Sequence, residues 1–421
     1  MRKFKSAIVY LLANITNSLM PLLLLPVFTK YLTPEEYGQV ALFQLVFIGL
    51  KSLVGQPIVT AGERSFFDDK IDSQQYINNC VILILGCSSF VILLSYAISD
   101  YFSELLSISK EYFYLAVITS IGAVFLQLRL GQYQVRKKSI EYAFFQIIFS
   151  LSINTLSLIL VVLFLKGADG RVYSFSILYF LVIFISFYSL NKDKAIDIKK
   201  VKYKSEYVTH IISFALPLIP HLIGVFILTI FDRIILSRTI GLDSLGIYMV
   251  AFQLMSSIGL FSDAINKFIY PYQMEMLKES SSSSYRNIVL IVYGWMVVLA
   301  FASIISVWIF SFIVTEFLDS RYFVVMDILP WLALGQFFNG IYLILLNNIY
   351  YNSATKHLSY TTILIGFFHV IMMYFFTSNY GLNGAGIAFS LSMLIRVIVI
   401  FYLANRQTYL PWNIIKKYYR E

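Results

Sequence analysis

Charged residues are scarce in this chain. Asp, Glu, Lys and Arg make up 13% of its 421 residues, whereas a soluble domain has about 25%. Hydrophobic residues make up 59% and the mean hydropathy is +0.76. This composition excludes an ordinary soluble globular protein and indicates an integral membrane protein, with no room for a separate soluble domain.

Residues that form disulfides, metal sites or catalytic centres are also few. Cys80 and Cys87 lie seven residues apart in one predicted helix, about 10.5 Å along its axis, too far to form a disulfide. The four histidines, His210, His221, His357 and His369, are scattered. The sequence therefore predicts no metal site and no cofactor, and a protein that is not an enzyme.

Long runs of apolar residues make up most of the sequence. Runs of about 18 residues or more predict twelve transmembrane helices, and they lack the alternation of β-barrel strands. They lie at residues 7–29, 37–60, 78–99, 111–133, 142–165, 171–190, 208–231, 245–270, 287–314, 327–350, 358–377 and 382–404. The predicted fold is an all-α integral membrane protein with 12 transmembrane helices.

The distribution of Lys and Arg predicts the orientation of these helices. With a cytoplasmic N-terminus, 21 of the 32 basic residues fall in cytoplasmic segments and six, including Arg171, in outer loops. Positively charged loops stay in the cytoplasm. Both termini are therefore predicted to be cytoplasmic, and the net charge of +9 is explained without nucleic acid as a partner.

The other five basic residues lie within or at the ends of predicted spans. Lys51 is about 21 Å from the outer end of its predicted helix, and Arg396 lies at a similar depth. A cation there costs about 3 kcal/mol or more, and neither helix supplies an acidic residue, so we predict that both bind substrate. Arg129 and Lys267 are further candidates, although long side chains can instead reach the interface.

Two acidic residues accompany these cations. Asp263 stands four residues before Lys267, so the two can neutralise each other on one helix face. Asp232 precedes Arg233 and forms either a structural pair or an ion site. Both carboxylates are candidates for ion coupling.

Polar side chains recur on single faces of otherwise apolar predicted helices. We predict that they line a water-filled interior, the alternative being helix packing. The predicted substrate-binding set is Lys51, Arg396, Arg129, Lys267, Gln44, Asn14, Asn17, Gln336 and Asn339.

The chain also contains a weak internal repeat. A shift of about 208 residues places "KYLTPEEYGQVALFQL" (30–45) over "RTIGLDSLGIYMVAFQL" (238–254). We therefore predict an N-terminal six-helix bundle at 1–190, a basic cytoplasmic linker at 191–207 and a C-terminal six-helix bundle at 208–421. Six helices per half make the bundles parallel repeats, a transporter design with a central cleft.

Three segments resemble a known superfamily: "LLPVFTKYLTPEEYGQVALFQL", "FDRIILSRTIGLDSLGIYMVA" and "YGLNGAGIAFSLS". Together with the twelve spans, they look like the polysaccharide-transport branch of the multidrug/oligosaccharidyl-lipid/polysaccharide (MOP) exporter superfamily, and within it the Wzx-type O-antigen flippases. The resemblance implies a V-shaped, MATE-like fold in the bacterial inner membrane. It implies translocation of an undecaprenyl-diphosphate-linked oligosaccharide to the periplasmic leaflet.

The same resemblance implies partners and leaves one alternative. The implied partners are membrane lipids, a polysaccharide polymerase, a chain-length regulator and a coupling ion, H⁺ or Na⁺. The alternative is a drug/cation antiporter of the same superfamily, which needs acidic residues at its binding site. The first helix has none, and Asp232 and Asp263 each have a basic neighbour.

Overall fold

The protein is all-helical throughout the part that the structure describes. The computed structural model describes residues 2–197, 202–216, 231–351, 355–408 and 410–413, and these contain no β-strand. The chain divides into two compact units, Met1–Phe226 (unit 1) and Ile227–Glu421 (unit 2). Each unit is described by itself below.

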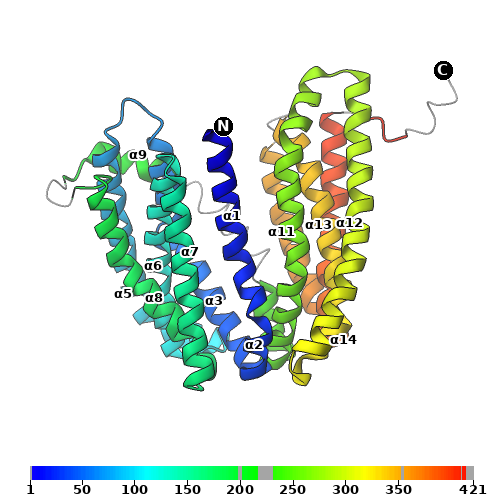
Figure 1. The fold of residues 1–421 in the computed structure, drawn as a ribbon, viewed down its shortest axis with the longest axis horizontal. Helices are drawn as coiled ribbons and strands as arrows, with labels where there is room; N and C mark the ends of the chain where they lie inside the picture. The colour runs from blue at the N-terminus through cyan, green and yellow to red at the C-terminus, as the bar shows by residue number, and fades with distance from the viewer. Residues whose placement is uncertain (1, 198–201, 217–230, 352–354, 409, 414–421) are drawn as a thin grey trace. The chain divides into compact units, whose positions relative to one another are not determined.

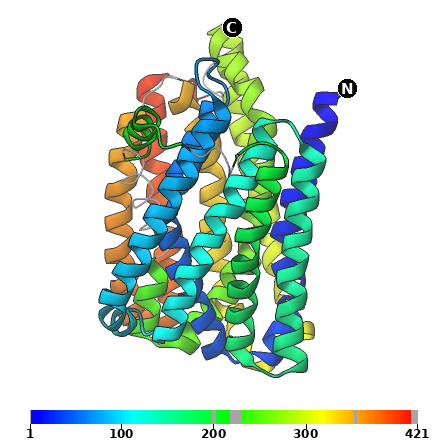
Figure 2. The same ribbon diagram turned by 90° about the vertical axis from the view of Figure 1, so that its left-hand side faces the viewer.

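Unit 1 is built from long helices and shorter ones that continue or join them. Figure 1 labels them in chain order, and Figure 2 shows α5, α6, α7 and α8 running alongside one another. They are α1 (Arg2–Leu23), α2 (Leu25–Tyr31), α3 (Pro34–Val54), α4 (Gln56–Ser65), α5 (Ser73–Leu106), α6 (Lys110–Val135), α7 (Ser139–Leu158), a π-helical turn η1 (Ile159–Leu163), α8 (Gly167–Lys192) and α9 (Ser205–Ala215).

Unit 2 contains the longest helices. Residues 231–239 are helical. They are followed by α11 (Leu242–Glu279), α12 (Ser282–Phe317), a 3-10 turn η3 (Ser320–Tyr322), α13 (Val325–Tyr351) and α14 (Thr355–Gln407). The last element joins two helices across a kink at Gly381, whose φ is +56°. Helix α13 packs against α11, α12 and α14.

Ten described helices are long and apolar enough to cross a membrane. The first six of them match the first six predicted spans, and the next three match the spans at 245–270, 287–314 and 327–350. The tenth, Thr361–Gln407, contains the predicted spans 358–377 and 382–404 almost entirely. Most of the remaining predicted span, 208–231, lies outside the described residues. The prediction of an all-α multi-pass membrane protein is confirmed.

Local sequence signals explain where several helices begin. The hydroxyl of Thr33 accepts a hydrogen bond from the Glu36 N–H, and the Glu36 carboxylate accepts one from the Thr33 N–H. This reciprocal capping box satisfies two N–H groups that a helix start leaves without partners. Asp72 caps α5 by accepting hydrogen bonds from the N–H groups of Gln74 and Gln75.

Helix starts recur at the spacing of the sequence repeat. Helices α3 and α11 begin at residues 34 and 242, which are 208 apart, and α5 and α12 begin at 73 and 282, which are 209 apart. This spacing agrees with the offset found in the sequence. The symmetry that relates the two units stays a prediction.

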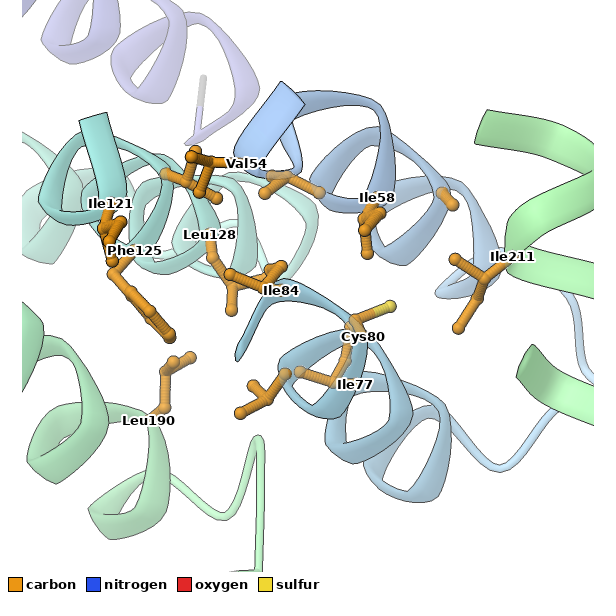
Figure 3. Close-up of a cluster of buried hydrophobic side chains, with 14 of the residues drawn as sticks. Val54, Ile58, Ile77, Cys80, Ile84, Ile121, Phe125, Leu128, Leu190 and Ile211 are labelled. Atoms are coloured by element: carbon orange, nitrogen blue, oxygen red, sulfur yellow. The ribbon is translucent and has the colours of Figure 1, made fainter. Parts of the chain in front are cut away.

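A cluster of buried apolar side chains holds unit 1 together. Figure 3 shows Val54, Ile84, Phe125, Leu190 and Ile211, which come from five different helices. Helices α6 and α8 approach closely, since a Cβ added at Gly122 would lie 2.1 Å from the Tyr179 carbonyl oxygen. Helices within a membrane associate mainly through such close van der Waals packing.

The segment between the predicted bundles is attached to unit 1. The Asn78 side chain exchanges two hydrogen bonds with the backbone of Asp197, and the Asn79 side chain bonds the backbones of Lys202 and Lys204. Helix α9 lies crosswise to the long helices (Figures 1 and 2) and packs on α4 and α5. The two compact units divide after residue 226, and the bundle boundaries at 190 and 208 stay a prediction.

Candidate functional site

Lys51 lies in the last turn of α3, and this helix ends earlier than the predicted span 37–60. Gly55 has a φ of +144°, and Pro57 follows in the first turn of α4. Glycine readily adopts such a φ, and proline interrupts a helix because it lacks an N–H donor. The break leaves carbonyl groups without helical partners beside Lys51, and a helix C-terminus favours a cation.

The Lys51 ammonium group has no ionic partner in the described part of the chain. The side chain is half-buried in unit 1, and no described residue gives its Nζ atom a hydrogen bond or an ion pair. Among the described residues, the C-terminal end of its own helix is therefore the favourable electrostatic neighbour that the structure shows. A cation held in this way remains available to an anionic ligand.

Arg396 is the corresponding cation of unit 2. It is half-buried on α14, and its guanidinium carbon lies 3.7 Å from the centroid of the Tyr342 ring on α13. Its Nη1 atom also lies 4.0 Å from the Met393 sulfur, and Tyr350 is near enough to interact with its charge. Among the residues that the structure describes, no carboxylate pairs with Arg396.

Arg129, by contrast, is part of an internal ion pair. Arg129 lies on α6 and is 1% exposed, and its Nη2 atom lies 2.5 Å from Asp193 Oδ2. Lys138 Nζ lies 3.1 Å from the same oxygen, and the Tyr133 ring centroid lies 3.7 Å from the Arg129 guanidinium carbon. Asp193 thus neutralises Arg129 through Nη2, while the Nε and Nη1 atoms are buried without a hydrogen-bond partner on a described residue.

The Asp193 carboxyl is held in its charged form. Partial burial by itself would raise its pKa, but the hydrogen bonds from Arg129 and Lys138 outweigh that effect and hold the pKa below its usual value. The carboxylate thus neutralises Arg129 at neutral pH, and the sequence analysis did not identify it as a partner.

Asp263 and Lys267 form the i, i+4 pair that was considered as an alternative to a functional role. Lys267 Nζ lies 2.6 Å from Asp263 Oδ2, and the two side chains are 70% and 50% exposed. Such an exposed pair contributes little to stability. Both groups are accessible, and each is neutralised by the other.

Asp232 is buried in unit 2, where it is 6% exposed. Its Oδ1 atom accepts a hydrogen bond from the backbone N–H of Arg233 at 3.0 Å, and its Oδ2 atom accepts one from the hydroxyl of Tyr248 at 3.2 Å. The carboxylate is therefore hydrogen-bonded on both oxygens. Any ion that it binds has to share these contacts.

The predicted amides of unit 1 are accessible. Asn14 is exposed on α1, and its Oδ1 atom accepts hydrogen bonds from the Tyr142 hydroxyl at 3.4 Å and from Gln146 Nε2 at 3.2 Å. Asn17 is also exposed, whereas Gln44 is half-buried on α3. Asn14 thus stands beside a tyrosine and a second amide, side chains that can hydrogen-bond sugar hydroxyls.

The predicted amides of unit 2 lie on α13 near Gly259 of α11. A Cβ added at Gly259 would lie 2.8 Å from Gln336 Oε1 and 4.0 Å from Asn339 Nδ2. Gln336 is 5% exposed, and its Oε1 atom has no hydrogen-bond partner in the described chain, while Asn339 is half-buried. A buried carbonyl oxygen of this kind can accept a hydrogen bond from water or a ligand.

A further amide network connects α11 and α13. Asn347 Nδ2 donates to Asn266 Oδ1 and to Gln273 Oε1, both at 2.9 Å, and Gln273 Nε2 donates to Asn348 Oδ1 at 3.0 Å. Asn347 belongs to the polar face predicted for this helix. These amides hydrogen-bond one another across the two helices, which favours packing over ligand binding.

Arg171 is a cation that the sequence analysis assigned to an outer loop. It lies instead in the first turns of α8 and is 8% exposed. Its guanidinium carbon lies 4.1 Å from the Phe28 ring centroid and 5.3 Å from that of Phe175, and its Nη1 atom lies 3.5 Å from Asn154 Oδ1. Two aromatic rings and an amide thus surround this buried charge.

The chain resembles proteins of polysaccharide biosynthesis over most of its length. A family model described as "Polysaccharide biosynthesis protein" matches residues 4–277. The chain belongs to this family. It is also 25% identical over 409 residues to "Lsg locus putative protein 1" of Haemophilus influenzae, a match that covers 94% of this chain and 96% of that protein. Membership in the MOP exporter superfamily, inferred from the sequence, is confirmed.

Solved structures of membrane transport proteins share the fold of this family member. The lipid II flippase MurJ in an inward closed conformation superposes with a TM-score of 0.77 at 15% identity, covering 94% of this chain and 87% of MurJ. An inward-facing MATE multidrug transporter superposes with a TM-score of 0.66 at 15% identity, covering 97% and 99% of the two chains. The MATE-like fold is therefore confirmed.

The family and its structural relatives are transport and biosynthesis proteins of the membrane. Within the part of the chain that the structure describes, no group of three or more His, Cys, Asp or Glu side chains could hold a metal ion. The polar side chains described above in the spans are isolated cations, paired cations and amides.

Proposed function

We propose that this protein is a flippase for an undecaprenyl-diphosphate-linked oligosaccharide, the repeat unit of O-antigen or a related polysaccharide. It moves the headgroup from the cytoplasmic to the periplasmic leaflet of the bacterial inner membrane by alternating access. The observation that carries this proposal is the pair Lys51 and Arg396, one in each unit, which lie within or at the end of membrane-spanning helices without a carboxylate partner among the described residues.

The chemistry of such a substrate fits these side chains. A diphosphate linked to a lipid and a sugar is strongly anionic, and its headgroup cannot cross hydrocarbon unaided. A lysine ammonium acts as a compact point charge, whereas a guanidinium binds phosphate through several N–H donors. The amides Asn14, Asn17, Gln44, Gln336 and Asn339 are suited to hydrogen-bond the sugar hydroxyls.

The paired charges have secondary roles in this proposal. Arg129 is 1% exposed and its charge is neutralised by Asp193, so it acts on the substrate only indirectly, through the fold of unit 1. Lys267 reaches the headgroup only when Asp263 releases it, for example when a coupling H⁺ or Na⁺ occupies that carboxylate. Asp232 is the second carboxylate proposed for ion coupling.

A drug/cation antiporter is the competing function on the same fold. It requires a carboxylate that is free to attract a cationic drug, and the two candidate carboxylates are engaged with Lys267 and with Tyr248. Lys51 and Arg396 would repel such a drug. The isolated cations therefore favour an anionic substrate.

An in-frame deletion of the gene tests the proposed function. We expect surface polysaccharide to disappear and lipid-linked repeat units to accumulate in the cytoplasmic leaflet. Complementation with Lys51→Arg should largely restore export, Lys51→Ala and Arg396→Ala should restore it poorly, and Lys51→Glu should not restore it because a carboxylate repels the diphosphate. Lys70→Ala, at an exposed loop position, is the control at matched expression.

Two results would contradict the proposal. Normal surface polysaccharide in the deletion strain, with increased drug sensitivity, would support the antiporter. Equal complementation by the Ala and Arg variants of Lys51 would show that its charge does not take part in substrate binding. Interaction with a polymerase or a chain-length regulator is a separate expectation, which co-purification of the tagged protein tests.

A further inference from the structure

Arg396 is held by the face of an aromatic ring. Its guanidinium carbon lies 3.7 Å from the centroid of the Tyr342 ring, well within the range of a cation–π contact. Tyr342 is 5% exposed and belongs to α13, which packs against α14. The ring is thus a fixed surface, and the guanidinium lies against it.

An aromatic ring face contacts the guanidinium without occupying its hydrogen-bond donors. The five N–H donors of an arginine lie in the plane of the group, in a fork that matches pairs of phosphate oxygens. Stacking restricts the orientation of this plane and reduces the entropy lost when a ligand binds. A lysine at the same position would offer a single ammonium group with no such fork.

Two other arginines on described residues, Arg129 and Arg171, lie about as close to a ring centroid as Arg396 does, and they differ from it in this respect. Arg129 stacks on Tyr133 but also donates to Asp193, and Arg171 stacks on Phe28 but also donates to Asn154. Arg396 contacts an aromatic ring and a thioether sulfur, and no hydrogen bond joins it to the nearby Tyr350. Among these three arginines, Arg396 alone has no oxygen acceptor on a described residue.

We propose that Tyr342 is a positioning residue for Arg396, and that the stacked guanidinium binds two oxygens of a diphosphate at once. This inference rests on the proposed function, because it makes Arg396 the residue that recognises the diphosphate. Lys51 attracts the same anion by its charge but does not orient it. It predicts that an arginine and an aromatic ring are both required, and that the diphosphate is preferred over a single phosphate.

Calorimetric titration of the purified full-length protein tests the inference, with inorganic pyrophosphate and inorganic phosphate as probes. We expect Tyr342→Phe to bind pyrophosphate like the wild type, because it keeps the ring face. Tyr342→Leu and Arg396→Lys should each weaken pyrophosphate binding by about fivefold or more and phosphate binding by less. The double variant should bind no more weakly than Arg396→Lys alone.

Non-additivity is the result that separates positioning from a general packing role. Tyr374→Leu, a substitution of an exposed tyrosine on α14, is the matched control. Additive losses in the double variant, a Tyr342→Leu protein with wild-type affinity, or no pyrophosphate binding by the wild type would each overturn the inference. If Tyr342→Leu has a lower melting temperature, the Phe variant and the pyrophosphate-to-phosphate ratio still test positioning.

Transport measurements distinguish this inference from the proposed function. If Arg396→Ala abolishes flipping of a lipid-linked saccharide in proteoliposomes and Tyr342→Leu does not impair it, the function stands and the positioning role is wrong. If Arg396→Ala transports normally, Arg396 has no part in the proposed function.

Discussion

Replacement of Asp193 by Asn is expected to destabilise unit 1 without abolishing recognition of the substrate. Asp193 is the partner of Arg129, which is 1% exposed and stacked on Tyr133. The variant keeps the shape of the side chain and removes its charge. Arg129 would then remain buried with its positive charge opposed only by an amide oxygen and a ring face.

The expected loss of stability follows from the burial of the pair. Removing one partner of a fully buried ion pair costs about 3–5 kcal/mol. The Asp193 side chain is 24% exposed, so water can solvate part of the charge that remains. We therefore expect a loss of about 2–3 kcal/mol in the free energy of unfolding, enough to lower the melting temperature by about 5 °C or more.

Thermal unfolding of the detergent-solubilised protein, followed by size-exclusion fluorescence, measures this effect. The combined variant Arg129→Met with Asp193→Asn removes both charges, so it should be more stable than Asp193→Asn alone. Lys138→Ala, which removes the more exposed cation from Asp193, should lower stability only slightly. If Asp193→Asn melts within 1 °C of the wild type, the argument that this pair neutralises a buried charge is wrong.

Two further predictions concern pH and membrane potential. Because the pKa of Asp193 is lower in the folded protein, the stability that its charge contributes should persist from pH 8 to pH 5. It should be lost below the unfolded value of about 3.9, so melting curves of the wild type and Asp193→Asn should converge in acid. A potential that is negative on the cytoplasmic side should speed export of the anionic headgroup. It contributes up to about 2.3 kcal/mol of driving free energy per uncancelled charge per 100 mV. Proteoliposomes with a potassium diffusion potential and no proton or sodium gradient test this, and a rate that does not change when the potential is reversed would contradict it.

Much of the fold could be predicted from the sequence because a membrane helix satisfies its backbone hydrogen bonds within its own segment. Runs of apolar residues therefore identified the spans, including those within α5, α11 and α12. The signals that end α3 were also present, since Gly55 and Pro57 interrupt the predicted span. Short sequence segments indicated the family, and the match of the family model to residues 4–277 confirms it.

The candidate site could be predicted only in part. Depth along a helix can be counted from the sequence, and it singled out Lys51 and Arg396 as charges without a partner in their own helices. The i, i+4 spacing likewise indicated the pair of Asp263 and Lys267. Both inferences use positions within one helix, and the number of residues between two positions gives their separation along that helix directly.

Only the tertiary structure showed what surrounds the other charges. Arg129 meets Asp193, 64 residues later in the chain, and Arg396 meets Tyr342 from the preceding helix. Arg171, assigned from the sequence to a loop, is enclosed by Phe28 and Phe175. The periodicity of one helix states which face a side chain occupies, but its partner depends on how neighbouring helices pack, and that packing is a property of the folded chain as a whole.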